Sequence, residues 1–261
     1  MDTQLRVLIL IPSRYQSSRF PGKPLSLIKS RNSQGQSVSR TLAHQVFLNC
    51  SQTQFSTHVV TDHDEIEKSL KDSGANVIRV DDDVPSGTER ICLAYQRNFE
   101  SQFDYIINVQ GDEPLLKAQE LIDLVHFHNK SDFDITTLVR PRNDKGEISN
   151  PNIVKTAMSG NGRCLYFSRS AIPFDRKPRH EWFQHIGVYC YKPSSLTRFV
   201  ELQESSLEKI ECLEQLRALE AGMSIGAIKT KSILMGVDTP EDLEKVNAHL
   251  LGTTETTGKE S

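Results

Sequence analysis

Strand-like apolar runs alternate with helical patterns along the first half of this chain, and this alternation constrains the fold most. The runs typical of buried strands lie at residues 5–11, 57–60, 76–80 and 105–109. The helical patterns lie at residues 38–48, 64–71, 88–97 and 118–128. Because strands joined through helices pair in parallel, the order predicts an α/β fold. We expect a mostly parallel, twisted sheet with helices on both faces.

The rhythm changes between residues 134 and 193, where short strand-like pieces are separated by connections rich in proline and charge. The pieces lie at residues 135–139, 153–156, 165–168 and 187–191. This pattern predicts a smaller β-rich insert that carries part of the active site and a dimer surface. The insert is expected to belong to one domain over residues 1–251.

Three further elements are expected after the insert. A helix is predicted over residues 207–219, with Ile210, Leu213, Leu216 and Leu219 facing inward. Residues 233–237 are predicted to form a closing strand. Thr239, followed by proline and two acidic residues, has the pattern of a capped helix start. The polar tail at 252–261 is expected to be disordered, and the glycine-containing segment at 29–37 is expected to be a loop.

The bulk properties exclude several classes of protein. The chain has 261 residues with 31 basic and 34 acidic side chains, a balance that argues against a nucleic-acid-binding surface. The longest apolar runs span about seven residues, too few to cross a membrane. Five cysteines are widely spread without a Cys-x-x-Cys pair, which favours neither a disulfide framework nor a zinc site. We interpret them as reduced thiols of a cytoplasmic protein.

A cationic loop follows the first predicted strand, at the edge of the sheet where α/β proteins bind ligands. It carries Arg14, Arg19 and Lys23, and Gly22 lets the backbone approach a ligand closely. Guanidinium groups grip phosphate oxygens and lysine adds a mobile charge. The loop therefore predicts a polyphosphate site, although it has neither the P-loop spacing nor the dinucleotide glycine pattern.

Acidic residues follow two predicted strands. Asp112, between Gly111 and Glu113, comes after the strand at 105–109, and Asp238 follows the strand predicted at 233–237. Mg²⁺ prefers one or two carboxylates together with substrate phosphates, so the pair could share a magnesium ion. The alternative is that both acids are turn residues, since Gly, Asp and Pro are common turn formers.

The segment Ser86-Gly87-Thr88-Glu89-Arg90 allows two compatible interpretations. Ser86 and Glu89 have the spacing of a capping box, which indicates a helix start. The free amides and the positive dipole end of such a start also suit a phosphate or a base edge.

Four polar residues in or after the insert are weaker candidates. Arg169 could bind a carboxylate through two hydrogen bonds, and His185 could bond a sugar hydroxyl. A lone Arg or His near a strand is more often structural. Glu214 and Gln215 lie on a predicted helix, where such side chains are ordinarily solvated.

Taken together, seven segments make the chain resemble the 3-deoxy-manno-octulosonate (Kdo) cytidylyltransferase family, also called CMP-Kdo synthetases. They occur in the family's order between residue 11 and about residue 246: IPSRYQSSRFPGKPL, SGTER, NVQGDEP, LYFSRSAIPFDR, HIGVYCY, LEKIECLEQLRALE and GVDTPEDLEKV. The resemblance implies a nucleotidyltransferase fold of the GT-A type and the reaction of CTP with Kdo to give CMP-Kdo and pyrophosphate. It further implies Mg²⁺ as cofactor, a homodimer, and a cytoplasmic role in lipopolysaccharide synthesis.

The resemblance also implies roles for the residues that match the family's motifs. Arg14, Lys23 and Arg19 would bind the CTP triphosphate, and Ser86, Gly87, Thr88 and Arg90 would lie near the nucleotide. Gln110 would contact cytidine or sugar. Asp112 and Asp238 would hold Mg²⁺, and with Arg14 and Lys23 they form the expected catalytic set. The residues expected to contact the sugar acid are Arg169, His185, Glu214 and Gln215.

Two departures from the family pattern bear on specificity. Where the family usually has Gly-Lys-Pro-Met, this chain has Gly35-Gln36-Ser37-Val38, and the segment at 177–184 is shorter than usual. Three alternatives stay open: an 8-amino form of Kdo as substrate, a sialic-type acid, or a noncatalytic nucleotide-binding regulator on the same fold. A dinucleotide-dependent reductase is disfavoured because the glycine fingerprint is missing.

Overall fold

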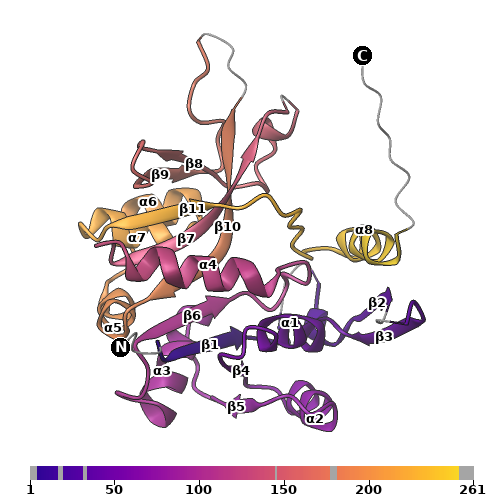
Figure 1. The fold of residues 1–261 in the computed structure, drawn as a ribbon. Coiled ribbons are helices and arrows are strands. Elements are labelled where there is room, and N and C mark those ends of the chain that lie inside the picture. The colour runs from indigo at the N-terminus through magenta and orange to yellow at the C-terminus, as the bar shows by residue number, and fades with distance from the viewer. Residues whose placement is uncertain (1–4, 17–19, 32–33, 145, 177–180, 253–261) are drawn as a thin grey trace.

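The computed structural model describes residues 5–16, 20–31, 34–144, 146–176 and 181–252. Within them a central sheet runs in the order β11-β7-β10-β6-β1-β4-β5, flanked by helices (Figure 1). The strands of this path are β1 Val7–Pro12, β4 Ser56–Thr61, β5 Val77–Arg79, β6 Tyr105–Val109, β7 Ile135–Arg142, β10 Trp182–Tyr191 and β11 Ile225–Lys229. The helices are α1 Leu42–Ser51, α2 Asp64–Asp72, α3 Gly87–Asn98, α4 Ala118–Asn129, α5 Pro193–Glu201, α6 Ser206–Glu211, α7 Gln215–Glu220 and α8 Pro240–Leu251.

The predicted mostly parallel sheet is confirmed. β1 pairs in parallel with both β6 and β4, and β4–β5 and β11–β7 are parallel as well. β10 is the exception, since it runs antiparallel to β6 and β7. All six residues of β1 are buried because helices cover both faces, which explains its continuous apolar run.

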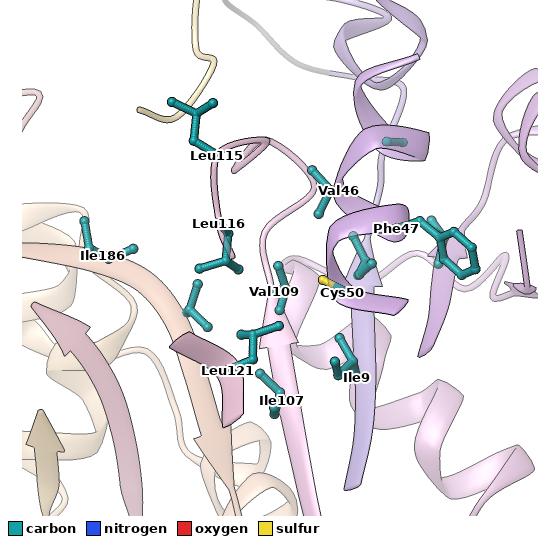
Figure 2. Packing of buried hydrophobic residues seen from close by; sticks show 14 of the residues in the cluster. Ile9, Val46, Phe47, Cys50, Ile107, Val109, Leu115, Leu116, Leu121 and Ile186 are labelled. Atoms are coloured by element: carbon teal, nitrogen blue, oxygen red, sulfur yellow. The ribbon is translucent and has the colours of Figure 1, made fainter. Parts of the chain in front are cut away.

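Alternate residues of the central strands point into two separate cores. Ile9 of β1 and Ile107 of β6 belong to one core cluster, and Leu8, Leu10 and Ile106 belong to the other. Figure 2 shows Ile9 and Ile107 together with Cys50 of α1 among the side chains of the first cluster. This two-sided burial fixes the sheet register, because a one-residue slip would exchange the two sets.

The helix predicted over residues 38–48 is partly wrong. Residues 37–41 form strand β3 (Ser37–Thr41), which pairs with β2 (Leu27–Arg31), and α1 begins only at Leu42. The side chain of Thr41 caps α1 by accepting a hydrogen bond from the His44 amide. The predicted polar loop at 29–37 is thus mostly a hairpin. Its first strand, β2, is bonded to α8, because the Lys29 amide donates to Asn247 Oδ1 at 2.8 Å.

The single helix predicted over residues 207–219 is also wrong. The chain forms α6 and α7, separated by a turn in which Cys212 has a left-handed backbone (φ 50°). Ile210 consequently faces solvent with 77% of its surface exposed, whereas Leu213 and Leu216 are buried as expected. The turn brings Arg217 onto Glu208, with two hydrogen bonds of 2.8 and 2.6 Å.

The strand predicted at 233–237 lies elsewhere. The strand of this region is β11, which ends at Lys229 before the predicted range begins. Residues 230–239 contain no regular element, and they return across the sheet toward β6 and α8 (Figure 1). Leu234 and Val237 are buried in the core without a partner strand, which explains their apolar character. Thr239 begins α8 with the predicted reciprocal capping box.

The segment at 134–193 is β-rich as expected, but two of its strands, β7 and β10, run in the central sheet. β8 (Lys155–Met158) and β9 (Cys164–Ser168) extend this sheet beside β10. Short 3₁₀ turns complete the elements, η1 at Lys23–Leu25 and η2 at Glu147–Ser149. The expected disordered tail lies, apart from Gly252, outside the described residues. None of the helices described is both long and apolar enough to cross a bilayer.

Candidate active site

Lys23, Asp112 and Asp238 form one charged cluster, although they come from three distant parts of the chain. Lys23 Nζ lies 2.6 Å from Asp112 Oδ2 and 3.5 Å from Asp238 Oδ1. Lys23 begins η1 directly after Gly22, whose left-handed backbone (φ 69°) suits glycine. The structure therefore brings together three of the four residues predicted to be catalytic.

Close backbone contacts place the two aspartates beside each other. A Cβ atom on Gly111 would lie 2.8 Å from Ser13 Oγ and 3.0 Å from the Pro12 carbonyl, so a glycine is required between β6 and Asp112. The amide of Val237 donates to the Asp112 carbonyl at 2.9 Å. This bond anchors the returning segment and sets Asp238 next to Asp112.

The donor chemistry of the cluster suits a magnesium ion that is shared with a phosphate. The described residues contain no group of three or more His, Cys, Asp or Glu side chains able to hold a metal. Mg²⁺ is, however, often held by one or two carboxylates together with substrate phosphates. Asp112 and Asp238 carry two negative charges against the single charge of Lys23, which leaves a net negative site for a cation.

Glu113 was not among the predicted site residues, although it lies in the same motif. Burial, reinforced by the neighbouring charges of Asp112 and Asp238, raises its pKa to about 8. Its Oε2 atom has no hydrogen-bond partner among the described residues. The carboxyl of Glu113 is therefore mainly neutral at pH 7 and backs the charged pair without adding to its charge.

A cavity of about 500 Å³ is lined by six of the predicted substrate-binding residues, among them Gln110, which precedes Asp112 by two positions. They are Arg14, Ser86, Gly87, Thr88, Gln110 and Glu214. Its wall also contains residues that were not predicted to bind substrate: Pro85, Glu204, Glu208, Lys209, Cys212, Leu213 and Arg217. Most of these lie on α6, α7 and the turn between them, where helical periodicity hid the break in the helix.

The start of α3 forms one wall of the cavity. Ser86 caps the helix by accepting hydrogen bonds from the amides of Thr88 and Glu89 at 3.2 and 3.3 Å. A Cβ atom on Gly87 would lie 3.1 Å from Pro12 Cγ, so the glycine lets α3 approach the end of β1. Capping and a position at the cavity therefore occur together, and the positive end of the α3 dipole favours an anion there.

A polar network joins the floor of the cavity to its opposite wall. Gln110 Nε2 donates to Asn108 Oδ1 at 3.5 Å, and Asn108 Nδ2 donates to Thr88 Oγ1 at 3.4 Å. Thr88 Oγ1 in turn donates to Glu214 Oε2 at 2.8 Å. Glu214 is half-buried rather than solvated as expected, and desolvation raises the pKa of its carboxyl. Gln215 is fully buried.

Arg90 and Arg19 are not placed at the cavity. Arg90 is 3% exposed, pairs with Asp62 Oδ2 at 2.8 Å and donates to the Val80 carbonyl. Its guanidinium therefore anchors α3 to the loops after β4 and β5. Arg19 lies outside the described residues.

Arg169 and His185 are not among the described residues that line the cavity. Arg169 donates to the carbonyls of Glu211 and Cys212 at 2.8 and 3.3 Å, and Cys212 lines the cavity. His185 Nε2 lies 3.2 Å from Thr137 Oγ1. Burial lowers the pKa of His185 to about 3, so the ring is neutral at physiological pH and available for hydrogen bonding.

Comparisons with known proteins agree on one group. The family model described as "Cytidylyltransferase" matches residues 8–225. The 3-deoxy-manno-octulosonate cytidylyltransferase of Cytophaga hutchinsonii is 38% identical, with 94% of this chain and 98% of that protein covered. The same enzyme of Thermodesulfovibrio yellowstonii is 39% identical, with 91% and 95% covered.

Solved structures give the same result. The structure of CMP:2-keto-3-deoxy-manno-octonic acid synthetase complexed with CTP has a TM-score of 0.85 and 31% identity, and covers 95% of this chain and all of that one. A cytidylyltransferase from Leptospira borgpetersenii, at 15% identity and a TM-score of 0.58, shares the fold over 94% of this chain and 86% of its own.

Proposed function

The chain belongs to the 3-deoxy-manno-octulosonate cytidylyltransferase family, and on this premise we propose that it activates Kdo with CTP. The anomeric hydroxyl of Kdo attacks the α-phosphorus of CTP in line, a P–O bond forms to the sugar, and pyrophosphate leaves. The hydroxyl proton passes to solvent or to a phosphate oxygen. The products are CMP-Kdo and pyrophosphate.

One observation supports the proposal more than any other: Asp112 of the Lys23–Asp112–Asp238 cluster follows Gln110 by two residues, and Gln110 lines a cavity together with Arg14 and the start of α3. Negative charge develops on the phosphate oxygens and the leaving group during nucleotidyl transfer. Arg14 and Lys23 supply fixed and mobile positive charge against it, and the amides at the start of α3 add hydrogen-bond donors. These groups stabilise the transition state more than the ground state, as catalysis requires.

Asp112 and Asp238 are the residues proposed to hold Mg²⁺. When bound, the ion neutralises phosphate charge and lowers the pKa of a coordinated hydroxyl. Lys23 bridges the two carboxylates, and its flexible stem would let the ammonium reach a phosphate oxygen.

The sugar acid is proposed to lie against the wall formed by the α6–α7 turn. Arg169 orients the substrate carboxylate, which aligns the attacking hydroxyl. The neutral ring of His185 and the amide of Gln110 suit sugar hydroxyls. Half-buried Glu214 and buried Gln215 each have a buried side-chain atom without a partner among the described residues, Glu214 Oε1 and Gln215 Nε2. A polar substrate could satisfy them.

A homodimer and a cytoplasmic location complete the proposal. Large apolar side chains are exposed near β9 and α6, with Phe174 at 89% and Ile210 at 77%. Such side chains suit a protein interface. All five cysteines are free thiols, as expected in a reducing compartment. Sedimentation velocity tests the dimer: a single monomeric species at micromolar concentration would contradict it.

The test of function is pyrophosphate release with CTP and Mg²⁺ across a panel of sugar acids. We expect Kdo to be turned over best, ahead of 8-amino-Kdo and a nine-carbon sialic-type acid. A preference for either of the others would move the chain to that substrate. Binding of CTP without turnover of any acid would support a regulator instead.

A further inference from the structure

Lys155 is a fully buried cation that the proposed reaction does not use. It begins β8 and is 0% exposed. Its Nζ donates to the carbonyls of Asn150 at 3.0 Å, of Ile153 at 2.7 Å, and of Arg169. An ammonium has three N–H donors, so all three are satisfied. Burying a charge is costly even when the charged group is fully hydrogen-bonded. One of the three bonds that offset this cost holds the backbone carbonyl of Arg169, so the position of Arg169 depends on Lys155.

Glu211 holds the same residue from the opposite side. Its Oε2 atom accepts a hydrogen bond from the Arg169 amide at 2.9 Å, and Oε1 accepts one from Ser168 Oγ at 2.6 Å. Lys155 therefore binds the carbonyl of Arg169 while Glu211 binds its amide. The backbone of Arg169 is fixed at both ends by groups of opposite charge.

The guanidinium of Arg169 is fixed as well. Three of its five N–H groups donate to backbone carbonyls, those of Glu211 at 2.8 Å, Pro151 at 3.0 Å and Cys212 at 3.3 Å. Two N–H groups are left over from these bonds, which is the number that a carboxylate can accept side by side. Lys155 and Arg169 carry two positive charges and Glu211 carries one negative charge, so the cluster has a net positive charge that favours an anion.

The same contacts hold the cavity wall. Glu211 ends α6, and the turn that follows supplies Cys212, Leu213 and Glu214 to the cavity. Since Arg169 bonds the carbonyls of both Glu211 and Cys212, its position sets the position of this wall. Movement of Arg169 would thus change the wall formed by the α6–α7 turn more than the Lys23–Asp112 pair, which is not among the described residues lining the cavity.

We propose that Lys155 and Glu211 are positioning residues that clamp Arg169 and the α6–α7 turn, and thereby set the affinity for the sugar acid. This inference rests on the proposed function, because it assigns the sugar carboxylate to Arg169. Neither residue touches substrate; both act through Arg169.

The experiment compares Lys155→Met and Glu211→Gln with wild type, measuring KM for Kdo and KM for CTP separately. We expect KM for Kdo to rise about tenfold or more in each variant, and KM for CTP to stay within about twofold. Glu211→Gln preserves shape, and it keeps the test informative if Lys155→Met does not fold. Calorimetric titration with Kdo alone should show the same loss of affinity.

Asp134→Asn is the matched control for Glu211→Gln. The Asp134 carboxylate also accepts a backbone amide and a serine hydroxyl, from Ser224 at 2.7 and 2.8 Å, but away from the cavity. The Asp134→Asn variant should have a lower melting temperature than wild type, with the ratio of KM for Kdo to KM for CTP unchanged. Equal changes of both KM values in Glu211→Gln, or none, would overturn the clamp. Failure of wild type to turn over Kdo would instead overturn the proposed function.

Discussion

Lys23 Nζ lies 2.6 Å from Asp112 Oδ2, although 89 positions separate the two residues in the chain. The contact exists because β1 and β6 are parallel neighbours, so the loops that follow them meet at one edge of the sheet. A cation from the first loop and an acid from the second thus share one site, and Asp238 joins them from the segment before α8.

Asp112→Asn should lower kcat by about 10²- to 10³-fold, because it removes charge from the proposed metal and phosphate site. The fold should persist, since the carboxylate is partly exposed. Steady-state kinetics with circular dichroism checks both points. Asp104→Asn is the control, because Asp104 forms an ion pair with Arg6 at the surface and should leave kcat unchanged. Near-normal turnover in Asp112→Asn would remove the metal assignment.

Gly111→Ala should displace the catalytic loop, because its new Cβ atom would lie 2.8 Å from Ser13 Oγ and 3.0 Å from a backbone carbonyl. We expect about 1–3 kcal/mol of lost stability, typical of overpacking, and a clear fall in kcat. Gly160→Ala is the control, since no atom lies within 4 Å of its added Cβ. Urea unfolding and kinetics measure the two effects. Equal behaviour of the two variants would contradict the close-approach argument.

Much of this arrangement follows from the sequence, for physical reasons. β1 and β6 are buried on both faces, so their unbroken apolar runs identify them, and the loops that follow are expected to converge. Val237 is equally apolar and gave a false strand, because it packs into the core without pairing. The turn at Cys212 left no glycine signal, and it hid both the break between α6 and α7 and the burial of Gln215.

Single residues were harder to place than elements. Arg90 follows the motif that lines the cavity, but its ion pair with Asp62 holds it on the other side of α3. Lys155 lies within the strand-like piece predicted at 153–156, and only the fold shows three carbonyls around its ammonium. Ion-pair partners distant in sequence therefore decide what motif spacing alone cannot.

Ser86→Ala should cost about 1 kcal/mol of stability, because two amides at the start of α3 lose their acceptor. It should also raise KM for CTP several-fold, since that helix start lines the cavity. Thr41→Ala removes the cap of α1 in the same way but away from the cavity. We expect a comparable loss of stability there with KM unchanged. An unaltered KM for CTP in Ser86→Ala would argue against nucleotide binding at α3.

Acid should destabilise the protein through His128. Burial lowers its pKa from 6.5 to about 4, so the folded state binds the proton less readily than the unfolded state. The stabilising contribution is complete above pH 6.5 and is lost as the pH falls toward 4. It amounts to about 3 kcal/mol at most.

Urea unfolding at pH 7 and pH 5 measures this effect. His128→Gln should show a smaller difference between the two pH values than wild type. His126→Gln, on the exposed face of the same helix, should behave like wild type. A pH dependence that survives in His128→Gln would assign the acid sensitivity to other groups.

The most direct test of the central claim is the mass of the product formed from CTP, Mg²⁺ and Kdo by the purified protein. We predict a single sugar nucleotide with the mass of CMP-Kdo, released with an equal amount of pyrophosphate. Recovery of unchanged Kdo, with CTP intact or merely hydrolysed, would contradict it.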